Sequence, residues 1–424
     1  MKQLLTFVVA LSLVSVWPAA AQPNPQILEP LSLTLQQAET RLLQRNRDIQ
    51  SAQRAVQSAQ AVQLGATARP NPQVSINSLN INPHSGLGAG GLRDKRVDTS
   101  LRIDELIERG NKRGLRMRVA QQLAQASQAD LGDTTRQARV ALAGTYYDLL
   151  FAQRKMRLMA DTAQLAEAAQ AKANLRLKAG DLAASEVARI EVDTLHTEND
   201  AQQAYADIAT AQLALAYLIG ADDAAARLRA VSDWPALTDA DTGLALETLI
   251  ARRPDMRAAQ ARLDAARTLR DLARAQRTRD ISVGAQLEHY PSGIDNTVGV
   301  GVSFPLFLGN HYEGNIRSAE VAVDAAQDAV ARTHARALGE LNAIRNALQV
   351  SAARLQRYQT GLIPAARRAA DAAEFAFAHG AISAVDVLDA RRVWRSIQLE
   401  ALSAQADYAK ALASWHINIQ PEQE

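Results

Sequence analysis

Residues 176–187 read RLKAGDLAASEV, and residues 375–387 read FAFAHGAISAVDV. In both stretches an alanine-rich helical segment reaches a glycine, Gly180 or Gly380, turns, and continues as another helical segment. The two glycines lie 200 residues apart. A fixed repeat period is a strong indicator of architecture, and this one predicts a tandem duplication of a very long helical hairpin.

The N-terminus has the pattern of an export signal peptide over residues 1–21. Lys2 supplies the positive charge, residues 4–17 the apolar run, and Ala19-Ala20-Ala21 the small-residue cleavage site. The run is too short for a permanent transmembrane helix. No cysteine follows the predicted cleavage site, so we expect no lipid anchor.

The composition argues against several classes of function. The chain contains no cysteine, which excludes disulfides, thiolate metal sites and cysteine nucleophiles. Its 47 basic and 45 acidic residues give a net charge of +2, which offers no argument for nucleic acid as a partner. Gly-x-Ser-x-Gly, Walker and dinucleotide motifs are missing, so we expect neither an enzyme nor a bound cofactor.

Helical periodicity accounts for most of the chain. Helices are expected at about residues 35–65, 112–178, 184–218, 242–279, 312–378 and 384–415. Thr34 and Gln37 form a capping-box pattern at the first of them, and Pro364 predicts a kink near the end of the fifth. Segment 112–178 alone makes a rod of ~100 Å, too long for the interior of a compact domain.

This pattern divides the chain into five parts. They are the signal peptide (1–21), a first repeat (22–220), an inter-repeat segment (221–241), a second repeat (242–418) and a C-terminal tail (419–424).

Each repeat also contains two segments that alternate between apolar and polar residues, as strands do. They lie at about 73–81 and 97–104, and at about 281–289 and 297–306. In the last of them Val298, Val300 and Val302 share one face, and the opposite face is small or polar. This pattern is typical of a membrane barrel wall with lipid outside and water inside. The alternative is a small soluble sheet that packs its apolar face on a core.

Four strands cannot close a barrel, and open strand edges are not tolerated in lipid. Two chains would supply eight strands, whose interior is filled by side chains. Three chains would supply twelve strands and leave room for a water-filled lumen. We therefore predict a homotrimer.

Four segments resemble the TolC family of outer-membrane efflux proteins, and the resemblance covers about residues 30–418. They are Leu33-Thr-Leu-x-x-Ala38 with Asn46, Arg252-Arg-Pro-Asp255, Phe304-Pro-Leu-Phe-Leu-Gly309, and Gly380-Ala-Ile-Ser-Ala-Val-Asp386-Val-Leu-Asp389. The first repeat departs from the pattern at Arg47, where proline is expected, and at Ala183, where the second tip has Ser383.

A fifth segment, LIERGNKR at 106–113, is similar to the Ile-Glu-x-Gly-Gly-Lys-Arg junction of the outer-membrane components of cobalt–zinc–cadmium efflux systems. Asn111 stands in place of the second glycine. Asparagine tolerates positive φ better than most residues, so we expect the turn to be kept.

The resemblance implies a mainly α-helical chain with a transmembrane β-barrel part. In the trimer a 12-stranded barrel would continue into a long periplasmic α-helical barrel. Such a protein is the exit duct of a tripartite efflux pump in the outer membrane of a Gram-negative cell. Its partners would be outer-membrane lipid, a periplasmic adaptor (membrane fusion protein) and an inner-membrane RND transporter.

The similarity of residues 106–113 to the cobalt–zinc–cadmium junction implies heavy-metal cations such as cobalt, zinc and cadmium as cargo. Two alternatives within transport are a duct for drugs and a duct for type I protein secretion. An alternative from another class is a soluble periplasmic coiled-coil adaptor.

The candidate site residues lie at the two turns. Asp386 and Asp389 are three residues apart and share a helix face. The resemblance implies that this face lines the tube axis, where three copies would form carboxylate rings that favour cations. The alternative is that they are ordinary solvated acids at a helix N-terminus. Arg391 is a candidate gate latch. Gly180, Ser185, Glu186, Gly380 and Ser383 are expected to shape the tips that contact the adaptor.

The seven histidines show no metal-ligand spacing, so we expect no dedicated metal site. They are more typical of solvated or loop residues. His379 is the one histidine singled out for testing, because it adjoins Gly380 at the tip.

Overall fold

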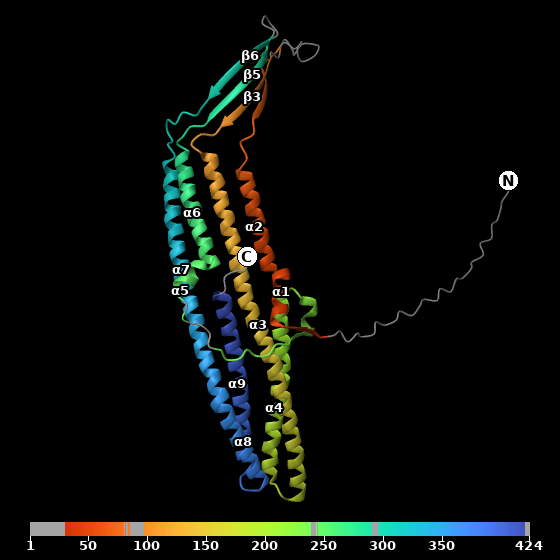
Figure 1. Ribbon diagram of the computed structural model, residues 1–424. Coiled ribbons are helices and arrows are strands. Elements are labelled where there is room, and N and C mark those ends of the chain that lie inside the picture. The colour runs from red at the N-terminus through yellow and green to blue at the C-terminus, as the bar shows by residue number, and fades with distance from the viewer. Residues whose placement is uncertain are drawn as a thin grey trace, which may run out of the picture.

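The computed structural model describes residues 30–79, 81, 84, 97–238, 243, 245–290 and 296–419. The predicted signal peptide, most of residues 82–96 between the first two predicted strands and nearly all of the predicted C-terminal tail lie outside these residues. The described part is elongated, with a β-sheet at one end and two helical hairpin tips at the other (Figure 1).

The two halves repeat one order of elements, which confirms the predicted tandem architecture. The first half contains β1 (Leu31–Leu33), α1 (Leu35–Arg45), α2 (Arg47–Ala66), β2 (Gln73–Leu79), β3 (Asp98–Ile107), α3 (Lys112–Ala179) and α4 (Ala184–Ile219). A 3-10 helix (Asp222–Arg227) and β4 (Leu228–Ala230) follow. The second half contains α5 (Leu246–Arg252), α6 (Pro254–Ala275), β5 (Ile281–His289), β6 (Asn296–Ser303), α7 (Glu313–Arg357), a π-helical turn (Tyr358–Leu362), α8 (Ile363–Ala378) and α9 (Ala384–Ile419).

The prediction of single helices over 35–65 and 242–279 was wrong, because each is divided by one residue in extended conformation. Asn46 (φ −64°, ψ 128°) separates α1 from α2, and Arg253 (φ −62°, ψ 138°) separates α5 from α6. The Asn46 side chain accepts hydrogen bonds from the amides of Asp48 and Ile49, both at 3.0 Å, and so caps α2. The capping box of Thr34 and Gln37 at α1 is confirmed.

The π-helical turn ends at Leu362, two residues before Pro364, where the sequence predicted a kink. Proline has no amide hydrogen and clashes with the preceding turn. A π-bulge is one of the standard ways in which a long helix accommodates such an interruption. The helix therefore continues through Pro364 into the tip.

The core lies about halfway along the molecule, where α3 and α4 pack against the short parallel pair β1–β4. Tyr146 of α3 is fully buried there, and its hydroxyl donates to the Leu33 carbonyl at 3.0 Å. The same oxygen accepts the Ser232 amide at 3.1 Å. The start of the first repeat is thereby bound to the segment that joins the two repeats.

The sheet at the far end has the strand order β2-β3-β5-β6, all antiparallel. The middle two strands come from different repeats, so the sheet joins the halves. β3 extends three residues beyond the predicted 104 and pairs through Ile107 with Ile281. β6 ends at Ser303 rather than 306, because Pro305 cannot donate to the ladder.

The junction from β3 to α3 keeps its predicted turn. Gly110 (φ 70°) and Asn111 (φ 57°) both adopt the left-handed conformation, which confirms that asparagine serves in place of the motif's second glycine. The ammonium group of Lys112 then lies 2.8 Å from a carboxylate oxygen of Asp280. Glu108 pairs with Arg116, whose hydrogen bonds hold the pKa of this carboxyl below its usual value.

Candidate functional site at the hairpin tips and the sheet

Both tips end their incoming helix with a left-handed glycine, as predicted. Gly180 has φ 83° and Gly380 has φ 73°. The next amide in each tip reaches back to close the last helical turn, from Asp181 to Arg176 at 2.9 Å and from Ala381 to Ala376 at 2.8 Å. A Cβ on either glycine would meet no atom within 4 Å, so glycine is required there for its backbone conformation.

Asp386 forms the start of α9 together with Ser383. Its carboxylate accepts from the Ser383 amide at 3.1 Å and from the Ser383 hydroxyl at 2.8 Å. These two hydrogen bonds lower the pKa of Asp386 below its ordinary value. The residue is exposed and stays ionised at neutral pH, so it carries both the helix cap and a surface negative charge.

The first tip keeps only half of this arrangement. Glu186 accepts from the Ala183 amide at 3.3 Å, but Ala183 has no side-chain oxygen to return the bond. Ser185 lies exposed in the first turn of α4. The two tips are therefore alike in backbone and different in polar chemistry.

Asp389 lines a groove between α4 and α9. The groove is also lined by Ala188, Arg189, Val192, Val385, Leu388 and Arg392. The structure thus brings an acid of the second hairpin to the same groove as Arg189 of the first. Beneath it, an apolar seam joins the hairpins through Ala173, Val187, Ile190, Ala384 and Leu388.

Arg391 pairs within its own hairpin, with Glu374 of α8 at 2.9 Å. Its neighbour Arg392 instead reaches across to Asp193 of α4 at 3.1 Å. The Asp193 side chain is only 10 % exposed. The pair that joins the hairpins is therefore one that sequence reasoning missed, and its two partners lie 199 residues apart.

The His379 ring packs against the Phe375 ring in a tilted arrangement, with centroids 4.2 Å apart and an interplanar angle of 38°. Its Nδ1 is 2.8 Å from the Phe375 carbonyl oxygen. Within the described ranges, no group of three histidine, aspartate or glutamate residues is placed to hold a metal ion.

The sheet has two faces of opposite character. Its apolar face carries Val74, Ile76, Leu101, Ile103, Val283, Leu287, Val298, Val300 and Val302. Val298 is 79 % exposed and Val300 is 88 % exposed, far beyond what a water-facing sheet accommodates. The other face carries Arg102, Asp104, Gln286 and Glu288 beside small residues.

Arg102 lies near the middle of β3. An arginine on the lipid side of a barrel costs ~2–4 kcal/mol at the membrane midplane. The valine face therefore suits lipid, and the Arg102 face suits water. None of the helices in the described part of the chain is both long enough and apolar enough to cross a membrane.

Comparison with known proteins agrees with this geometry. Residues 245–414 match the family model described as "Outer membrane efflux protein". The chain is 25 % identical over 360 residues to the cobalt-zinc-cadmium resistance protein CzcC of Cupriavidus metallidurans, covering 85 % of this chain and 83 % of that one. The chain is thus similar to outer membrane efflux proteins, most clearly in its second half.

Solved structures of an outer membrane protein and of a transmembrane channel have the same fold. The outer membrane protein VceC of Vibrio cholerae superposes with a TM-score of 0.77 at 19 % identity, over 92 % of this chain and 97 % of that one. CusC superposes with a TM-score of 0.74 at 17 % identity, over 95 % and 96 %. The predicted TolC-type fold and the predicted outer-membrane location are confirmed.

Proposed function

We propose that this protein is the outer-membrane exit duct of a tripartite RND-type efflux pump, and that its cargo is heavy-metal cations such as cobalt, zinc and cadmium. The observation that most strongly supports a duct is the sheet at one end of the long helical bundle. One face of this sheet exposes valines, and the opposite face is charged. The similarity to a cobalt-zinc-cadmium resistance protein supports the cargo. Asn111 in the junction motif adopts the conformation of the glycine it replaces, which adds support.

The working unit in this proposal is a homotrimer. Each chain would contribute its sheet of four strands, with the edge strands β2 and β6 paired to neighbouring chains. Closure satisfies edge hydrogen bonds that lipid cannot. Repeats 22–220 and 242–418, joined by 221–241, would then each supply one hairpin of the periplasmic tube. A periplasmic adaptor would contact the tips at Gly180, Ser185, Glu186, Gly380 and Ser383, and the adaptor would link the duct to an inner-membrane RND transporter.

The tips would form the gate. Asp386 and Asp389 are both exposed on α9, and rings of three carboxylates would attract cations and exclude anions. Arg391 would brace the second hairpin through Glu374. The Arg392–Asp193 pair joins α9 to α4 and would act as the latch, because opening must separate the hairpins.

The duct and its gate are tested by conductance in a planar bilayer, with the wild type and the Asp386→Ala/Asp389→Ala double variant. We expect stable channels that divalent cations block from one side only, and loss of that block in the double variant. A membrane-extracted oligomer that never conducts would refute the duct. A protein that stays monomeric and soluble without detergent would favour the adaptor alternative.

The cargo is tested separately in cells. A strain that lacks the gene should become sensitive to cobalt, zinc and cadmium salts while keeping its drug tolerance and protein secretion. Sensitivity to drugs alone, or loss of a secreted protein, would replace the metal proposal with the corresponding alternative.

A further inference from the structure

The polar face of the sheet carries a continuous chain of hydrogen bonds across β3 and β5. Arg102 donates to both carboxylate oxygens of Asp104, at 2.6 and 2.7 Å, and to the Gln286 side chain at 3.0 Å. Gln286 in turn donates to Glu288 at 2.9 Å, and the Tyr290 hydroxyl donates to the second oxygen of Glu288. We call these five residues, Asp104, Arg102, Gln286, Glu288 and Tyr290, the polar ladder.

Three glycines make room for the polar ladder to lie flat. A Cβ at Gly284 would come within 2.2 Å of an Asp104 oxygen and 2.8 Å of an Arg102 nitrogen. A Cβ at Gly299 would meet Gln286 at 3.0 Å, and one at Gly301 would meet Arg102 at 3.3 Å. All three glycines lie on the same face as the ladder. The side chains are therefore held against the strands and do not extend into the space above the sheet.

The charges in the polar ladder do not cancel. Arg102 forms a two-bond ion pair with Asp104, which neutralises one carboxylate. Glu288 accepts only from neutral donors within the ladder, the amide of Gln286 and the phenol of Tyr290. These bonds orient the Glu288 carboxylate without reducing its charge. The ladder thus keeps one net negative charge per chain.

From this asymmetry we propose that Glu288 determines ion selectivity inside the barrel, independently of the aspartates at the tips. The proposal rests on the trimeric duct proposed above. Three copies of Glu288 place a ring of negative charge on the water-filled side of the wall, where low-dielectric surroundings strengthen its field. Arg102 has the opposite role, because it screens Asp104 and limits the total negative charge of the ring. The ring would favour the passage of hydrated cations and disfavour that of small anions.

The test is the reversal potential of single channels in a KCl gradient, which gives the permeability ratio of K⁺ to Cl⁻. Glu288→Gln should lower this ratio roughly threefold, as expected when a screened charge is removed from each of three chains at a distance of about one Debye length. Arg102→Gln should raise the ratio, because it releases the charge of Asp104. Both effects should shrink in concentrated salt.

Glu105→Gln is the matched control. Glu105 lies on β3 but on the apolar face, opposite Val283, so removing its charge should leave the ratio unchanged. Channels whose ratio is the same in wild type, Glu288→Gln and Arg102→Gln would overturn the role of the ladder and leave the duct intact. An equal shift in Glu105→Gln would also overturn it, because the effect would then not depend on the face. A wild-type oligomer that forms no channels would instead refute the proposed function itself.

Discussion

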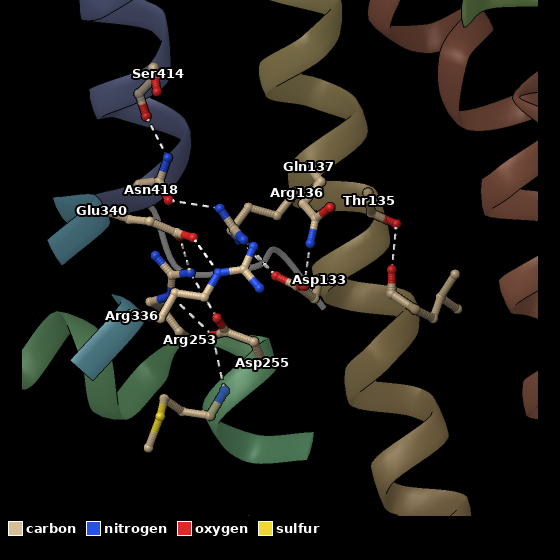
Figure 2. Close-up of polar contacts among 12 residues, drawn as sticks. Asp133, Thr135, Arg136, Gln137, Arg253, Asp255, Arg336, Glu340, Ser414 and Asn418 are labelled. Atoms are coloured by element: carbon tan, nitrogen blue, oxygen red, sulfur yellow. Dashed lines mark hydrogen bonds and ion pairs between the residues drawn. The ribbon is translucent and has the colours of Figure 1, made fainter. Parts of the chain in front are cut away.

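Arg253 is a buried charge whose loss should destabilise this fold. It is buried at the junction of α5 and α6, with its side chain 2 % exposed. It donates to both carboxylate oxygens of Asp255, at 3.0 and 2.7 Å, and to Glu340 of α7 at 2.8 Å. Figure 2 shows this network together with a neighbouring one, in which Arg136 of α3 contacts Asp133 and the Asn418 side chain of α9.

The size of the effect of Arg253→Met follows from what the change leaves behind. Removing one partner from a buried ion pair costs ~3–5 kcal/mol, because the remaining charge stays buried and unpaired. Asp255 is 19 % exposed and Glu340 is 34 % exposed, and Glu340 keeps a second partner in Arg336. Because both carboxylates are partly exposed, we expect the cost of losing Arg253 to lie near the low end of this range. The Nη1 atom of Arg253 is also buried with no hydrogen-bond partner within the described structure. Replacing arginine by methionine removes this unsatisfied donor, which should offset the loss of stability by ~1 kcal/mol or more. We therefore expect a net loss of about 2–3 kcal/mol in the free energy of unfolding.

The assay is denaturant unfolding of the purified oligomer, followed by tryptophan fluorescence. Trp415, which is fully buried on α9, is a suitable reporter. Arg253→Lys is the conservative control, since it keeps the charge and loses the fork that binds Asp255. In a Glu340→Gln background the cost of Arg253→Met should fall by about 1 kcal/mol or more, because the two residues are coupled. A cost below about 1 kcal/mol, or an equal cost in both backgrounds, would refute this reasoning.

The ion pairs of Arg253 with Asp255 and Glu340 also predict that the stability of the fold depends on pH. Burial would raise the pKa of Asp255 and of Glu340, but the hydrogen bonds and charge of Arg253 outweigh it and hold both pKa values below normal. A lowered folded-state pKa stabilises the protein above the unfolded value, and this stabilisation is lost as the pH falls through the folded value. The stability difference between wild type and Arg253→Met should therefore be complete at neutral pH and shrink below about pH 4.

Three further predictions follow from the other junctions. Asn46→Ala should cost ~2 kcal/mol in denaturant unfolding, because it removes the cap of α2 and a buried hydrogen bond; Asn46→Asp should recover most of the cap, and equal losses in both variants would contradict this. Arg392→Gln should raise the leak conductance of the closed channel more than Arg391→Gln does, because only Arg392 joins the two hairpins; equal leaks would exclude it as the latch. The protection of amides at the start of α9 against hydrogen exchange, relative to their intrinsic rates, should fall when the pH drops below the depressed pKa of Asp386, and Ser383→Ala should move this onset to higher pH; an onset that does not move would show that the serine does not set it.

The elements that sequence reasoning located well are those specified by local chemistry. Both tips depend on a glycine that can adopt positive φ, so the turns at Gly180 and Gly380 were readable from two matching stretches. The strand Ile281–His289 was predicted at its observed bounds. Side chains of a strand alternate between its two faces, so the pattern also showed which residues share a face.

Contacts between distant helices were not predictable in the same way. Asp193 and Arg392 meet only because α4 and α9 present particular faces to each other over an apolar seam. The rotation of a helix about its own axis is set by packing along its whole length, and an alanine-rich surface permits several rotations. The latch candidate chosen from the sequence was Arg391, one position earlier, and it pairs with Glu374 of its own hairpin.

The two helix breaks show how one conformation can be specified by different residues. At the second break Pro254 disfavours the helical region for the residue before it, so the extended Arg253 could have been read from the Arg-Pro pair. At the first break Arg47 occupies the position of that proline, and the helical pattern runs on without an interruption. Asn46 nevertheless takes almost the same φ and ψ as Arg253. Its side chain caps α2 and donates to the Leu218 carbonyl at 2.9 Å, so a cap and a tertiary hydrogen bond replace the steric restriction that proline supplies elsewhere. The two repeats therefore share this backbone geometry although different residues impose it, and a rule based on proline alone finds only the second break.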